Sequence, residues 1–121
     1  MPRTIENRDE AFIRQKIAKQ RHSARYVRHI PWELSTERLV REILANPICQ
    51  LSGEPLVFEP NYVYTFSLDR KDSRKGYTHD NVQWVGVSVN TAKSNLADND
   101  FVDMCLSVAK HRTKLLESES E

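Results

Sequence analysis

Apolar residues recur at approximately helical spacing in the first part of the chain, while cations cover most of the opposite face. The apolar positions between residues 8 and 28 are Phe12, Ile13, Ile17 and Ala24. A period near 3.6 residues with a charged opposite face is typical of an amphipathic helix. The pattern therefore predicts a basic helix over residues 8–28.

A second apolar stripe runs through ELSTERLVREILAN. Ser35 or Thr36 provides a start signal, and Asn46 and Pro47 provide a stop. The stripe consists of Leu34, Leu39, Val40, Ile43 and Leu44. We expect a second helix here, with this stripe in the core.

The pattern changes after residue 47. ICQLSGEPLVFEP has turn residues between short apolar runs, which predicts an extended ribbon closed by a turn. The runs YVYTFSLDR and NVQWVGVSV are rich in β-branched and aromatic residues, and a polar stretch with Gly76 separates them. These two runs predict an antiparallel hairpin around a long loop.

The segment TAKSNLADNDFVDMCLSVAKHRTKLLE is helical in pattern, in two pieces if Asp98, Asn99 or Asp100 caps a second start. Its expected buried stripe is Phe101, Met104, Cys105, Val108 and Ala109. The final ESESE is expected to be solvated and disordered. The fold class predicted is α+β, with a basic helical arm and packing helix in residues 1–46, a hairpin-plus-helix domain in 47–116 and an acidic tail in 117–121.

Charge adds an asymmetry to this picture. The 121 residues suit one compact domain, and the net charge of only +1 indicates no global basic field. Residues 1–29, however, hold eight Arg or Lys against three acids. Cations along one helix can follow a phosphate backbone, although a simply solvated face is the alternative. The candidate DNA contacts are Arg14, Lys16, Arg21, Arg25 and Arg28.

Cysteine content and hydropathy indicate the compartment. Cys49 and Cys105 are too few for a disulfide framework or a four-cysteine zinc site. No apolar run approaches the roughly 20 residues needed to span a bilayer. We therefore expect a cytoplasmic protein with no membrane partner.

Three polar residues can converge on a hairpin followed by a helix. Asp69 lies near the end of the first hairpin strand, Asn81 at the start of the second, and Asn90 opens the helix. Their oxygens are of the hard type that Mg²⁺ or Mn²⁺ prefers. Each also has a simpler interpretation: an ion pair for Asp69, a turn for Asn81 and a helix cap for Asn90.

The blocks CQLSGEPL, SLDR, KGYTHDNVQWV and VNTAKSNL, in this order, resemble the HNH (ββα-metal, His-Me finger) endonucleases, especially small phage-type members. The resemblance covers about residues 49–101. It implies a ββα-metal core, one divalent ion, a DNA substrate and a phage or mobile-element origin, hence a bacterial host cytoplasm.

The resemblance also assigns residue roles. Asp69 and Asn90 would bind the metal, Asn81 would tie the long loop to the hairpin and orient a general base, and Lys93 would hold a phosphate. The usual base histidine is replaced by Arg70, which stays protonated but could bind the scissile phosphate. His79 is the nearby imidazole and so the candidate base. The two CxxC pairs that many relatives use for zinc are also missing, so no structural zinc is expected.

Two functions follow from these features. The first is a metal-dependent DNA endonuclease or nickase, with Asp69, Asn90, Asn81, Arg70 and His79 at its active site. The alternative is a catalytically inactive HNH-like module that binds DNA or a protein partner as a regulator or inhibitor, which the missing base histidine supports. An adaptor for an acidic protein and a homodimer also stay open.

Overall fold

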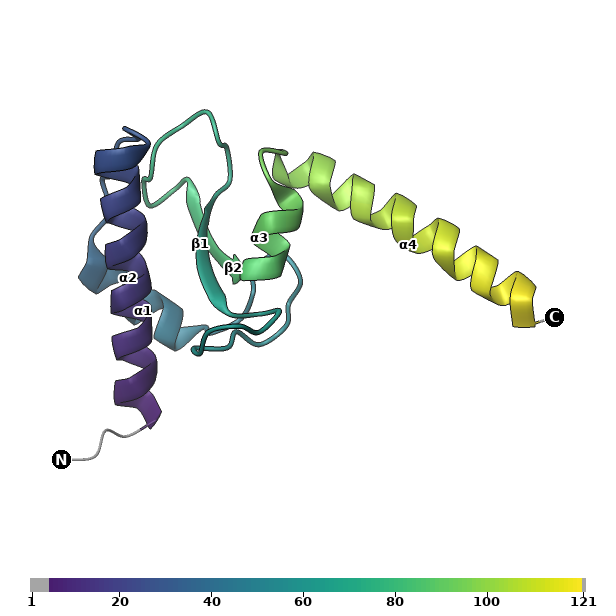
Figure 1. Ribbon diagram of the computed structural model, residues 1–121, viewed down its shortest axis with the longest axis horizontal. Helices are drawn as coiled ribbons and strands as arrows, with labels where there is room; N and C mark the ends of the chain where they lie inside the picture. Colours follow the sequence, from purple (N-terminus) through teal and green to yellow (C-terminus); the bar gives the residue numbers. More distant parts are fainter. Residues whose placement is uncertain (1–4, 121) are drawn as a thin grey trace.

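The computed structural model describes residues 5–120 and shows a mixed α+β architecture, as the sequence predicts. Figure 1 shows the elements in chain order. They are α1 (Ile5–His22), which continues into a π-helical turn (Ser23–Val27), α2 (Thr36–Ala45), β1 (Phe66–Arg70), β2 (Val82–Gly86), α3 (Val87–Lys93) and α4 (Asp98–Ser120).

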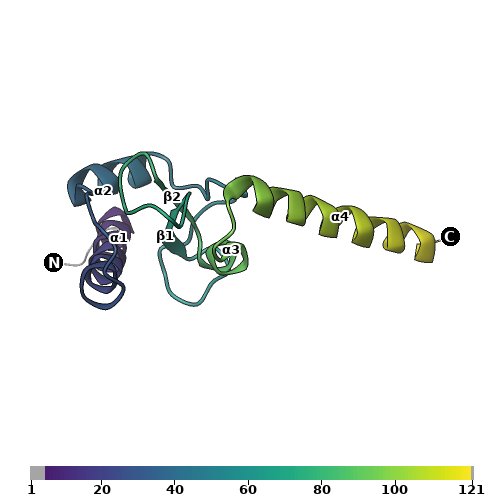
Figure 2. The same ribbon diagram turned by 90° about the horizontal axis from the view of Figure 1, so that it is seen from above.

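The antiparallel hairpin of β1 and β2 forms the centre of the domain. Its register pairs Phe66 with Gly86 and Asp69 with Gln83. Helices α1 and α2 lie on one side of the hairpin and α3 on the other, as Figures 1 and 2 show from two directions. Apolar side chains of the hairpin and of the first two helices form one core, whose most deeply buried members include Ile13, Ile17, Leu39, Ile43, Phe66, Leu68 and Val85.

The predicted first two helices and the hairpin are confirmed. The hydroxyl of Ser35 accepts a hydrogen bond from the backbone N–H of Arg38 at 3.2 Å and caps the start of α2. The helix ends at Ala45, and Asn46 is its C-cap. This side-chain acceptor satisfies one of the backbone donors that the first turn of a helix leaves unpaired. No described helix is long and apolar enough to cross a membrane.

The ribbon expected after residue 47 is reduced to a single bridge. Ile48 pairs with Pro55, and the N–H of Cys49 donates to the carbonyl of Glu54 at 2.8 Å. Gly53 closes the turn at φ 79°, in the left-handed region that favours glycine. Pro55 has no N–H to donate, which limits the ladder at this point.

Helix α3 begins at Val87, three residues before the predicted start at Asn90. The residue before it, Gly86, packs against the backbone of the preceding loop. A Cβ at this position would lie 2.8 Å from Cα of Tyr64 and 3.0 Å from the carbonyl oxygen of Val63. Only glycine fits, and this close packing sets the angle at which α3 leaves the hairpin.

Replacing Gly86 with alanine should therefore lower the free energy of unfolding by about 1–3 kcal/mol, the usual cost of overpacking. Urea denaturation followed by circular dichroism measures this loss. Trimming the ring with Tyr64→Ala in the same chain should not restore stability, because the Cα and carbonyl contacts belong to the backbone. Recovery in the double variant would contradict this explanation.

Helix α4 differs most from the prediction. Of its expected buried stripe only Phe101 is buried, while Met104 is 43% and Val108 58% exposed. The helix leaves the domain in both views (Figures 1 and 2). It also continues through residues 117–120, so this part of the expected disordered tail is helical, and Glu121 lies outside the described residues.

Candidate functional site

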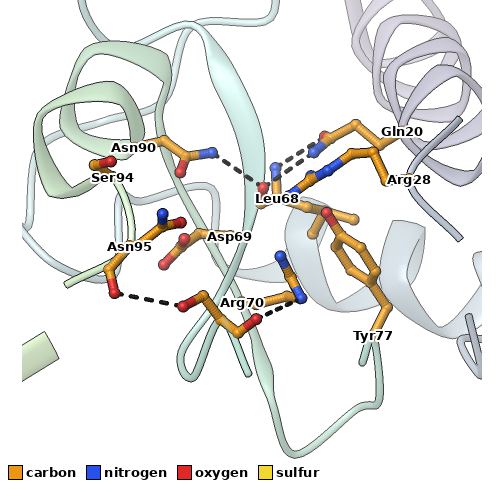
Figure 3. Close-up of a pocket in the computed structure, with 10 residues that line it drawn as sticks. Gln20, Arg28, Leu68, Asp69, Arg70, Tyr77, Asn90, Ser94 and Asn95 are labelled. Carbon is orange, nitrogen blue, oxygen red and sulfur yellow. Dashed lines mark hydrogen bonds between the residues drawn. The ribbon is translucent and has the colours of Figure 1, made fainter. Parts of the chain in front are cut away.

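A polar cavity of about 120 Å³ opens between the end of α1, strand β1 and helix α3 (Figure 3). Its lining residues are Gln20, Arg28, Leu68, Asp69, Arg70, Ser73, Tyr77, Asn90, Ser94 and Asn95. Four of the predicted site residues thus border one cavity: Asp69, Arg70, Asn90 and the candidate DNA contact Arg28. Arg28 follows the π-helical turn directly and borders the cavity from that side.

The carboxylate of Asp69 is held by a buried lysine. The ammonium of Lys93, whose side chain is 1% exposed, donates to Oδ2 of Asp69 at 2.6 Å and to the carbonyl of Arg70 at 2.9 Å. It also lies 3.0 Å from Oδ1 of Asp98 at the start of α4. The amide of Gln83 donates to the same Oδ2 of Asp69 at 2.9 Å and to Asp98. Four side chains therefore form one network, in which Lys93, Asp69 and Gln83 are buried and Asp98 is partly exposed.

This network corrects the prediction for Lys93. A lysine one turn after Asn90 was expected to hold a phosphate, but its ammonium is enclosed between Asp69, Asp98 and the Arg70 carbonyl. All three donors of an ammonium are satisfied by these oxygens. Lys93 is thus a structural cation that ties α3 to β1 and to the first turn of α4.

Asn90 reaches the cavity from α3. Its amide nitrogen donates to the hydroxyl of Ser67 at 2.9 Å and to the carbonyl of Leu68 at 3.1 Å. Its oxygen is turned toward the side of the cavity that holds Asp69 and Asn95 (Figure 3). The helix-cap alternative does not apply, because α3 starts three residues earlier at Val87.

Gln20 on α1 is a cavity residue that the sequence analysis missed. Its side-chain amide donates to the carbonyl of Leu68 and accepts from the N–H of Leu68, both at 3.0 Å (Figure 3). It satisfies the backbone of β1 on the edge away from β2. A signal was present in the sequence, since Gln20 lies between Ile17 and Ala24 on the apolar stripe, where a polar residue needs a partner.

Asn81 ties the long loop to the hairpin. Its side-chain oxygen accepts from the N–H of Asp72 at 3.0 Å, and its nitrogen donates to the carbonyls of Asp72 at 3.1 Å and Gly76 at 2.9 Å. The same loop holds Asp72 against Arg74, whose guanidinium lowers the pKa of that carboxyl to about 2. The tie agrees with the role that the resemblance implies, whereas orientation of a catalytic base stays a prediction.

Arg70 shapes the loop and also faces the cavity. One guanidinium nitrogen donates to the carbonyls of Ser73 and Lys75, both at 2.9 Å. The guanidinium carbon lies 5.3 Å from the centre of the Tyr77 ring, a cation–π distance. The remaining donors of its fork are those that could reach a bound anion.

His79 lies elsewhere. Its Nε2 accepts a hydrogen bond from the backbone N–H of Ser35 at 2.9 Å, which braces the loop against the start of α2. Its Nδ1 is buried without a hydrogen-bond partner among the described residues. His79 is not one of the residues that line the cavity. With its acceptor nitrogen used in this contact, the geometry does not favour the predicted role of general base.

The predicted DNA-binding cations of α1 separate into two groups. Arg14 is paired with Glu37 at 2.7 and 2.9 Å and with Glu10 at 3.2 Å. These carboxylates raise the pKa of Arg14, and its guanidinium lowers the pKa of Glu37. Because its charge is compensated, Arg14 is a poor candidate for phosphate contact.

Among the other candidates, Arg21, Arg25 and Arg28 are exposed, whereas Lys16 is partly buried. Lys16 borders a separate hollow between α1 and the loop at Pro60. Arg21 and Arg25 line a shallow polar hollow beside His22 and Tyr26, and Arg28 borders the Asp69 cavity. Arg21, Arg25 and Arg28 thus follow one another at intervals of four and three residues, and the last of them borders the cavity.

The residues around the cavity offer one carboxylate, Asp69, and the amides of Asn90 and Asn95. Within residues 5–120, no group of three or more His, Cys, Asp or Glu side chains is placed to hold a metal ion.

Comparisons of the chain with family models, curated proteins and solved structures found no match.

Proposed function

We propose that this chain is an HNH-like ββα module that binds the phosphate backbone of DNA at the Asp69 cavity, without needing a metal ion. The observation that carries the proposal is the Lys93–Asp69 contact at 2.6 Å, with side chains 1% and 6% exposed. In the family that the chain resembles, the corresponding acid holds a divalent ion. Here a lysine ammonium supplies the positive charge beside it.

The charge balance of the cavity favours an anion. Lys93 offsets only one of the two carboxylates that it contacts, Asp69 and Asp98, so this network keeps one negative charge. The guanidinium groups of Arg28 and Arg70 then leave one net positive charge around the cavity. Arginine presents a planar set of donors that suits phosphate oxygens. The exposed Arg21 and Arg25, which precede Arg28 by seven and three residues, add further positive charge near the end of α1. Such contacts give affinity for the backbone without choosing a base sequence.

A divalent ion fits this arrangement poorly. Oδ2 of Asp69 already accepts from Lys93 and Gln83, and an ion bound to that carboxylate would face the Lys93 ammonium across a few ångströms. Two like charges at that separation repel strongly in a buried site. We therefore assign no catalytic step to a metal in the arrangement described.

The metal-dependent nuclease is the second candidate, and one observation favours it. Asp69 and Asn90, the two ligands that the resemblance implies, border the same cavity from β1 and α3, with Arg70 beside them. Their shared cavity is the ground for testing cleavage alongside binding.

Fluorescence anisotropy with a labelled duplex, in the presence of EDTA, tests the first candidate. We expect binding that weakens steeply with salt, and an Arg28→Ala variant that binds about tenfold more weakly with a salt slope reduced by about one. Arg41→Ala removes the same charge from the exposed face of α2 and should leave the affinity nearly unchanged. Equal losses in both variants, or no binding at low salt, would overturn the cavity as the phosphate site.

Incubation of supercoiled plasmid with Mg²⁺ and then Mn²⁺ tests the second candidate. The binding proposal expects the plasmid to stay intact while its mobility shifts. Nicks that appear with metal and disappear in an Asn90→Ala variant would instead establish the nuclease. Asn90 is the better position to change than Asp69, because removing Asp69 would leave Lys93 without its shortest ionic contact.

A further inference from the structure

Helix α4 carries a largely apolar seam that begins beside the domain and continues outward along the helix. We define the α4 seam as Val102, Leu106, Ala109, Thr113 and Leu116. These positions are separated by four, three, four and three residues, the spacing of a helix–helix contact of the coiled-coil type. Val102, Leu106 and Leu116 are 42%, 51% and 60% exposed. An isolated helix is only marginally stable in water, and an exposed apolar patch is typical of an interaction site. We therefore expect another helix to cover the seam.

From these features we propose that α4 pairs with α4 of a second copy of this chain, in antiparallel orientation. The seam carries small residues, Ala109 and Thr113, opposite which the larger Leu106 and Val102 of another helix fit. With Leu106 packed on Ala109 of the second copy, Val102 packs on Thr113. Large and small side chains then alternate along the contact, which is the condition for close interdigitation.

The charges beside the seam determine the orientation. Asp103 and Lys110 each follow a seam residue directly and stand seven residues apart, so they lie on the same side of the helix. In the antiparallel register Asp103 lies opposite Lys110 of the second copy, and the pair occurs twice by symmetry. In a parallel pair Asp103 would instead face Asp98 of the second copy, so that two like charges lie opposite one another. Exposed ion pairs contribute little affinity, but they discriminate between orientations.

An apolar groove offers a second contact for the same partner. A hollow of about 360 Å³ lies between α4 and the domain, lined by Leu51 and Val89 from the domain and by Phe101, Val102, Cys105 and Leu106 from α4. The antiparallel register brings the C-terminal half of the second α4, including its Leu116, alongside this groove. The groove and the seam are thus continuous, and one helix can cover both.

Size-exclusion chromatography with light scattering measures the assembly. We expect twice the chain mass of 14.1 kDa for the full chain. Leu106→Glu should give the monomer, because it places a charge at the centre of the seam. Val108→Glu is the matched control: it adds the same charge at an exposed position of the same helix outside the seam, and the dimer should persist. A monomeric wild-type chain, or equal effects of the two variants, would overturn the proposal.

Charge reversal tests the orientation. Asp103→Lys and Lys110→Asp should each weaken the dimer by roughly tenfold, because each puts like charges opposite one another. The double variant restores two opposite-charge pairs and should recover the wild-type dissociation constant. Circular dichroism would verify that the helical content is unchanged. Failure of the double variant to recover would contradict the antiparallel pairing.

Discussion

Replacing Lys93 with methionine should lower the free energy of unfolding by about 3–5 kcal/mol. Methionine keeps an unbranched apolar stem of similar length but removes the ammonium that contacts Asp69, Asp98 and the Arg70 carbonyl. Asp69 is 6% exposed, so its carboxylate would be buried without a compensating charge. Urea denaturation of the two chains measures the difference.

Two further variants separate the charge effect from packing. Lys114→Met makes the same change at an exposed position of α4 outside the α4 seam and should alter stability by less than about 0.5 kcal/mol. Adding Asp69→Asn to Lys93→Met removes the uncompensated charge, so the double variant should be more stable than Lys93→Met alone. A loss below about 1 kcal/mol in Lys93→Met would show that the network is not a major source of stability.

Asn81→Ala should cost about 2–4 kcal/mol and loosen the loop between the strands. The change deletes three hydrogen bonds at a position that is 7% exposed, and it leaves the N–H of Asp72 and the carbonyl of Gly76 without these partners. Denaturation measures the stability, and faster hydrogen exchange at the Asp72 amide would report the opening of the loop.

An aspartate at position 81 separates the contribution of the two hydrogen bonds that the side chain donates from that of the one it accepts. Asn81→Asp keeps the oxygen that accepts from Asp72 but replaces the donating nitrogen with an oxygen that faces the carbonyls of Asp72 and Gly76. It should be at least as destabilising as alanine. Asn99→Ala, on the exposed first turn of α4, is the control and should change little. A tolerated aspartate would show that the two donated bonds are dispensable.

The early part of the fold follows from local signals. The cap at Ser35, the stop at Asn46 and the β-branched runs around the loop act over a few residues, and the structure confirms the elements they predict. The sequence predicts a start of α3 that is three residues too late, because Val87 and Val89 favour a strand by composition. A helix forms at Val87 instead of a longer strand because Gly86 allows the chain to pass close to the backbone of Tyr64.

The buried face of α4 could not be predicted in the same way. Periodicity shows which side of a helix is apolar, and the stripe from Phe101 to Val108 is a real pattern. Whether another element covers that side depends on the direction of α4 at residues 94–98, where Ser94 adopts φ 51° and breaks the run of α3. Direction is a tertiary property that no spacing of residues encodes.

Only part of the expected convergence is found at the cavity. Asp69 and Asn90 border it together with Arg70, whereas the Asn81 side chain is bonded within the loop and does not line it. Lysine is almost never fully buried unless it is paired, so the sequence predicts an exposed Lys93. The pairing that buries it includes Asp98, for which the sequence indicates only a helix cap. His79 is a candidate base by residue type alone, because an imidazole can accept a proton. Only the fold shows that its Nε2 already accepts a hydrogen bond from the backbone N–H of Ser35.

The Gln20 contact has a consequence for solubility. A two-stranded sheet has exposed edges, and an unpaired edge can recruit a strand from another molecule and start aggregation. At Leu68 the outer edge of β1 is occupied by a side-chain amide that donates and accepts as a peptide group does. Helix α1 thereby blocks intermolecular strand addition at the middle of the hairpin.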